Sequence, residues 1–109
     1  MELTIRDYAK AARRTMNPKL TWEQARNHAL FGIGSECGEI LGLYQKTYQG
    51  HELRKESVMD ELGDLMWFAM ELCYAEKIDP QDVLEHNVEK LVKRYPDGFA
   101  IERSVHRDV

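Results

Sequence analysis

The chain has 109 residues, of which 15 are Lys or Arg and 19 are Asp or Glu, so its formal net charge is −4 at pH 7. This length predicts a single domain over residues 1–109, with a core small enough that a partner subunit could help to complete it. The negative charge argues against a nucleic-acid-binding surface, because such surfaces neutralise phosphates with lysine and arginine. No apolar segment has the length of a signal peptide or of a membrane span, so we expect a cytoplasmic protein with neither nucleic acid nor membrane as a partner.

Two capping boxes mark the starts of the first two predicted helices. Thr4 with Asp7, and Thr21 with Gln24, have the spacing at which a hydroxyl and the side chain three residues later cap the same helix N-terminus. The second of these helices should end near Gly50, since glycine commonly follows the last helical residue.

A third and a fourth helix complete the pattern. Asp79 is a suitable N-cap for the fourth, with Pro80 at the first helical position, where its missing N–H costs nothing. No period-2 alternation predicts a strand. The predicted fold class is therefore all-α, a helical bundle with two long antiparallel central helices, completed by oligomerisation. The four expected helices span about residues 4–15, 22–49, 54–77 and 80–94.

The second predicted helix contains two glutamates three residues apart, Glu36 and Glu39, in the sequence GSECGEILG. Like charges at this spacing share a helix face and repel each other by a few tenths of a kcal/mol, and by more if they are buried. Each glycine in a helix costs about 0.8 to 1 kcal/mol relative to alanine, so several of them indicate a close approach of another helix or of a ligand. The glycines of this helix are Gly32, Gly34, Gly38 and Gly42.

The third predicted helix repeats the arrangement with Glu61 and Asp64 in MDELGDLMWF. If the two helices pack antiparallel through their apolar stripes, these acids and the glutamates of the second helix converge at the edge of the contact. Four adjacent carboxylates stay ionised only with a cation among them. Oxygen ligands favour Mg²⁺, with Mn²⁺ as a possible substitute, whereas a di-iron site is disfavoured because the chain lacks a Glu-x-x-His motif.

The alternative interpretation is that each acidic pair is an ordinary solvated helix face. Two pairs in glycine-containing segments of neighbouring helices favour a common site over two solvated faces. The two cysteines, Cys37 and Cys73, lie in apolar helical patterns outside any zinc-type cluster, and we expect both to be reduced core residues.

The segments GSECGEI, DELGDLMWF and NVEKLVKRYPDGF follow one another in this order, with DYAKAARRT near the start. The set resembles the MazG-like branch of the all-α NTP pyrophosphatase superfamily over roughly residues 5 to 99. The resemblance implies Mg²⁺-dependent hydrolysis of nucleoside triphosphates between the α and β phosphates, which releases a nucleoside monophosphate and pyrophosphate. It also implies a homodimer, or a homotetramer made of two dimers.

Carried over by motif, the resemblance makes Glu36, Glu39, Glu61 and Asp64 the metal ligands. One of the two glutamates Glu36 and Glu39 would orient or deprotonate the attacking water. The residues available to contact the substrate phosphates are Asn87, Lys90 and Arg94, which form a stripe on the fourth helix, and Lys46 on the second. The competing interpretation of that stripe is a solvated charged face.

Two alternative functions stay open at this point. The chain could be a non-catalytic helical dimer that binds nucleotides or a protein partner, with the acids as an inert surface. Within the enzyme class, it could be a phosphoribosyl-ATP pyrophosphohydrolase. The base and sugar of the substrate do not follow from the sequence.

Overall fold

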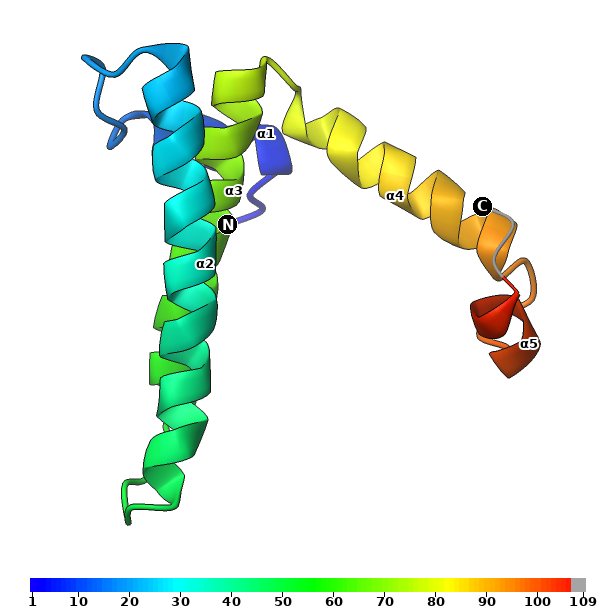
Figure 1. The fold of residues 1–109 in the computed structure, drawn as a ribbon. Coiled ribbons are helices and arrows are strands. Elements are labelled where there is room, and N and C mark those ends of the chain that lie inside the picture. Colours follow the sequence, from blue (N-terminus) through cyan, green and yellow to red (C-terminus); the bar gives the residue numbers. More distant parts are fainter. Residues whose placement is uncertain (107–109) are drawn as a thin grey trace.

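The computed structural model describes residues 1–106 as five helices joined by short loops, and no strand is formed within that range. Figure 1 shows two long antiparallel helices, α2 and α3, with α1 packed beside their upper end and α4 leading away from them. The predicted all-α class and the pair of long central helices are confirmed. The helices are α1 (Ile5–Arg13), α2 (Trp22–Thr47), α3 (Lys55–Glu76), α4 (Pro80–Arg94) and α5 (Ile101–Val105).

Both predicted capping boxes are formed. The Thr4 hydroxyl accepts the Asp7 N–H at 3.0 Å while the Asp7 carboxylate accepts the Thr4 N–H at 3.3 Å. The Thr21 hydroxyl accepts the Gln24 N–H at 3.2 Å, and the Gln24 side chain accepts the Thr21 N–H at 3.0 Å. These bonds satisfy N–H groups that have no partner inside the helix, which is why α1 and α2 start where the sequence predicts.

The start of α4 is also as predicted, and it is tied to α1. Asp79 accepts the Gln81 N–H at 2.9 Å with Pro80 at the first helical position. The same carboxylate receives Arg6 of α1, whose Nη2 lies 2.9 Å from Oδ2. Asp79 therefore begins one helix and anchors another. The short α5 is an element that the sequence did not predict, since its five residues carry no capping side chain.

The fully buried positions in the contact between α2 and α3 hold small or acidic residues. The buried residues of α2 recur every three or four positions and face the buried and half-buried residues of α3. Part of the expected apolar stripe, including Ile33 and Leu65, is half-buried. Of the acids, Glu36 is buried and Glu61 is half-buried, whereas Glu39 and Asp64 are exposed at the edge. The buried positions are Ala25, Ala29, Gly32 and Glu36 on α2, and Glu71 and Ala75 on α3.

Much of the apolar sector of α2 is exposed in the single chain. Phe31 and Leu41 keep 74% and 71% of their surface accessible, and Tyr44 is also exposed. Cys37 lies in the same sector and is exposed, so the prediction that it is a core residue is wrong, whereas Cys73 is half-buried. The periodic apolar pattern is real, but a neighbour other than α3 would have to cover it.

Helix α4 leaves the α2–α3 hairpin and carries α5 at its far end (Figure 1). It contacts α1, and much of its apolar surface is open to solvent. None of the described helices combines the length and the apolar character that crossing a membrane requires.

Candidate metal centre between α2 and α3

Three of the predicted acids come together midway along the α2–α3 hairpin. Glu36 and Glu39 of α2 and Glu61 of α3 each offer a carboxylate oxygen, and these oxygens lie within 4.8 Å of one another. The i, i+3 spacing places the two α2 glutamates on adjacent turns of one face. The antiparallel packing of α3 then brings the third carboxylate from the opposite side. The packing therefore brings Glu61 to Glu36 and Glu39, which precede it in the chain by 22 or more positions.

Burial makes this cluster costly unless a cation joins it. Glu36 is only 8% exposed, and Glu61 is half-buried. The Oε2 atoms of both are withdrawn from solvent and have no hydrogen-bond partner in the protein. A buried carboxylate oxygen without a partner is destabilising, and a shared proton, a water or a bound cation would relieve that cost.

The pKa values of Glu39 and Glu61 reflect the close approach of the carboxylates. The pKa of Glu39 is raised, first by hydrogen bonding with Glu61 and then by the negative charge of that residue. The pKa of Glu61 is raised as well, mainly by hydrogen bonding with Glu36. Each shift means that the carboxylates favour a shared positive charge, which a proton or a metal ion can supply.

Asp64 lies one turn after Glu61 and completes the acidic side of a cavity. This cavity of about 280 Å³ is lined by Thr15, Glu36, Asp64, Trp67 and Phe68. Thr15 accepts a hydrogen bond from Trp67 Nε1 at 2.7 Å, so the turn that follows α1 forms one side of the cavity. Carboxylates and aromatic rings therefore line the same cavity, although Asp64 is not one of the three residues whose oxygens lie within 4.8 Å.

Tyr8 of α1 also approaches this acidic side. Its hydroxyl donates to the Gly63 carbonyl at 3.3 Å. Burial raises the pKa of Tyr8, and the negative charge of Asp64 adds to that shift.

The four predicted phosphate contacts lie in two different places. Lys46 is near the cluster, since its positive charge counteracts the raised pKa of Glu39. Asn87, Lys90 and Arg94 lie on α4, which extends away from the hairpin (Figure 1). Within one chain, the acids and the α4 stripe do not form one site.

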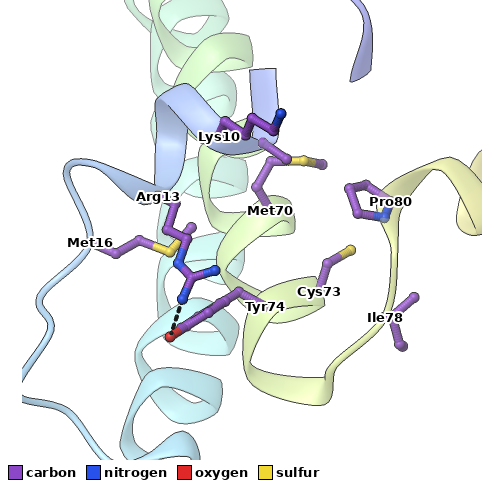
Figure 2. Close-up of a pocket in the computed structure, with 9 residues that line it drawn as sticks. Lys10, Arg13, Met16, Met70, Cys73, Tyr74, Ile78 and Pro80 are labelled. Atoms are coloured by element: carbon purple, nitrogen blue, oxygen red, sulfur yellow. Dashed lines mark hydrogen bonds between the residues drawn. The ribbon is translucent and has the colours of Figure 1, made fainter. Parts of the chain in front are cut away.

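A second hollow, of about 180 Å³, is apolar and separate from the acids. It lies between α1, the C-terminal part of α3 and the start of α4, and Figure 2 shows Met70, Cys73 and Pro80 around it. Arg13 closes its rim, with Nη2 3.1 Å from the Tyr74 hydroxyl. None of the described residues that line this hollow has a carboxylate, so they do not provide the ligands that a hard cation would need.

Two features of the side chains in the acidic cluster are suited to binding a divalent cation. It presents oxygen atoms from two helices within 4.8 Å of one another, and two of its buried oxygens lack partners. Oxygen-only donor sets suit hard ions such as Mg²⁺ or Mn²⁺. Glu36, Glu39 and Glu61 would hold the ion, and Asp64 lies on the same side of the cavity.

Comparison with known proteins agrees with this geometry. Searches of curated proteins and of solved structures give no match to the chain. The family model for the MazG nucleotide pyrophosphohydrolase domain matches residues 24–99, which is more than half of the chain and contains all four acids. The predicted resemblance is thereby confirmed. The chain belongs to the MazG nucleotide pyrophosphohydrolase family.

Proposed function

We propose that the protein hydrolyses nucleoside or deoxynucleoside triphosphates between the α and β phosphates in a Mg²⁺-dependent reaction. The products would be a nucleoside monophosphate and pyrophosphate. The observation that carries the proposal is the cluster of three carboxylates, two of whose buried oxygens have no protein partner, in a chain of the MazG family. The cytoplasm, where nucleoside triphosphates are made and used, is the location that such a reaction implies.

The burial of the three glutamates suggests which of them bind the cation and which one acts as the base. Glu36 is buried and Glu61 is half-buried, so both have the fixed positions that ligands of a cation require. Glu39 is exposed and can exchange a proton with solvent, which makes it the better placed of the two candidate bases to accept a proton from the attacking water. Bound Mg²⁺, or Mn²⁺ in its place, would stabilise negative charge on the triphosphate and on the leaving pyrophosphate.

The cavity beside the cluster is a suitable place for the rest of the nucleotide. Glu36 and Asp64 form its acidic side, and Trp67 and Phe68 form its aromatic side. A nucleobase stacks on aromatic rings whatever its identity, with about 1 to 3 kcal/mol for each stacked base. The arrangement supports binding of a base on the rings while its phosphates reach the acids.

We also propose that the active protein is a homodimer, or a tetramer made of two dimers. The exposed apolar sector of α2 is a large surface of the kind that self-association covers. A second copy could further bring Asn87, Lys90 and Arg94 of its α4 to the acids, since α4 of the same chain points away from them (Figure 1). Lys46 would assist from the same chain.

The test is a panel of canonical and modified nucleoside triphosphates incubated with the protein and Mg²⁺, with all products separated by chromatography. The proposal expects equal amounts of monophosphate and pyrophosphate from at least one substrate, and no product when EDTA is present. Release of diphosphate and inorganic phosphate would contradict it. Including phosphoribosyl-ATP in the panel separates that more specialised activity from a general one.

A further inference from the structure

The most deeply buried large side chain of the described residues is not in the acidic cluster. It is Glu71 of α3, which is 1% exposed. Its Oε1 lies 2.6 Å from Nδ1 of His28 on α2. A carboxylate removed from water is costly without a partner, so this contact constrains the imidazole. Next to an ionised carboxylate, Nδ1 of the imidazole carries a proton and donates it to Glu71.

The imidazole held in this way packs on two aromatic rings. Its centroid is 6.2 Å from that of Trp67 and 5.6 Å from that of Phe68. Those two rings pack on each other at 5.1 Å, almost perpendicular. The same two rings line the cavity that Glu36 and Asp64 share. His28 does not line that cavity, so it can act there only through the rings.

The aromatic pair has two other supports. Trp67 donates its indole N–H to the Thr15 hydroxyl, and Phe68 lies against the bare backbone of Gly32. Without the imidazole, the rings would lose their contact on the side of His28 and gain freedom to tilt. Edge-to-face aromatic contacts stabilise a ring pair enough to favour one orientation of a ring over others.

We propose that the His28–Glu71 pair is a positioning device that fixes the Trp67–Phe68 wall of the cavity. It acts on nucleotide binding and not on the chemical step. The inference rests on the proposed function, because it assumes that the nucleotide contacts this wall. His28 and Glu71 touch neither the acids nor the reacting phosphates in this arrangement, so they are positioning residues and not catalytic ones.

The test compares KM and kcat for three variants at saturating Mg²⁺, using the best substrate of the panel. His28→Asn keeps an amide N–H close to the position of Nδ1 for Glu71 but has no ring, and we expect KM to rise about fivefold to tenfold with kcat within about twofold. His28→Ala should raise KM by a similar factor. Glu71→Gln keeps a buried acceptor for Nδ1 together with the imidazole, so its KM should stay within about twofold of the wild type.

Folding of each variant is checked by circular dichroism. His28→Asn is the decisive variant, because its amide N–H still gives the buried Glu71 carboxylate a hydrogen-bond donor. A folded His28→Asn protein with wild-type KM would overturn the proposal. A fall in kcat at unchanged KM would overturn it too, since that result would assign His28 to the chemical step. A purely structural pair would change the melting temperature in these variants and leave KM unchanged.

A second readout does not require activity. The chain has two tryptophans, so in a Trp22→Phe background the fluorescence comes from Trp67 alone. We expect His28→Asn to shift its emission and to increase its fast depolarisation, because the indole loses its edge contact. Unchanged emission and unchanged anisotropy decay would overturn the positioning role even if the protein hydrolysed no nucleotide, so this failure is distinct from failure of the proposed function.

Discussion

Gly32 of α2 lies directly against the ring of Phe68 on α3. A Cβ built on Gly32 would fall 2.2 Å from Cδ1 and Cε1 of that ring, far inside the distance at which carbon atoms can approach. The glycine therefore sets how closely the two long helices approach. Because Phe68 also lines the cavity beside the acids, the closest helix contact and the wall of the site depend on the same pair.

Substitution Gly32→Ala should consequently destabilise the protein. The added methyl group forces the helices or the ring to move, and overpacking of this kind costs about 1 to 3 kcal/mol, which outweighs the gain in helix propensity. Gly63→Ala is the matched control, since a Cβ there would meet no atom within 4 Å. Urea unfolding measures the free energy of unfolding of both variants and of the wild type. Equal or greater stability of Gly32→Ala would show that the contact is looser than the structure has it.

The glycines on the outer face of α2 lead to a different prediction. Within one chain, a Cβ on Gly34 or Gly38 meets no atom within 4 Å. If this face is covered by a second copy, Gly38→Leu should reduce the mass measured by light scattering to that of the monomer. Glu52→Leu in the exposed α2–α3 loop is the control and should leave the mass unchanged. A wild-type protein that is already monomeric would contradict the proposed assembly.

Cation binding should stabilise the folded protein. A ligand at 100 times its dissociation constant adds about 2.7 kcal/mol to the free energy of unfolding, so Mg²⁺ should raise the melting temperature and EDTA should reverse the effect. The variant Glu36→Gln removes a buried ligand and should lose most of this response. Glu89→Gln on α4 serves as the control with an unchanged response. A melting temperature that is independent of Mg²⁺ in the wild type would indicate that the acids hold no cation.

The ion pair between Arg6 and Asp79 predicts how stability depends on pH. Hydrogen bonding to Arg6, and then to the Gln81 N–H, holds the pKa of Asp79 below its usual value. A carboxyl group with a lowered pKa stabilises the fold above its unfolded pKa of about 3.9, and this contribution is lost as pH falls through the lower folded value. Arg6→Gln should therefore melt at a lower temperature than the wild type at pH 7.

The difference between Arg6→Gln and the wild type should shrink as pH falls below about 3.9, because protonated Asp79 has no charge to pair. Lys19→Gln, in the loop before α2, is the control and should show no such pH dependence. A difference between Arg6→Gln and the wild type that stays constant from pH 7 to pH 2 would mean that the ion pair is not its cause.

Local signals in the sequence were sufficient to place four of the five described helices and the acids on them. Thr4, Thr21 and Asp79 cap the helices as their spacing predicts, because capping depends only on residues within one turn. The convergence of Glu36, Glu39 and Glu61 also followed, since two helices joined by a short loop must run antiparallel.

The packing face of α2 could not be predicted in the same way. A helical pattern reveals which residues share a face, but it does not tell which neighbour covers that face. The broad apolar sector that includes Cys37 was assigned to the α2–α3 contact, whereas Cys37 is exposed and small residues such as Ala29 and Gly32 are the fully buried ones. The pairing of His28 with Glu71, 43 positions apart, likewise depends on the register of the two helices.

The most direct measurement of the central claim is the rate of pyrophosphate release from a nucleoside triphosphate by wild-type protein and by Glu61→Gln, each with Mg²⁺. Glu85→Gln on α4 is the matched control. We expect Glu85→Gln to keep the wild-type rate and Glu61→Gln, still folded by circular dichroism, to lose at least about a hundredfold in rate, since one ligand of the charge-stabilising ion is removed. A folded Glu61→Gln protein that releases pyrophosphate at the wild-type rate would contradict the assignment of the acidic cluster as the catalytic centre.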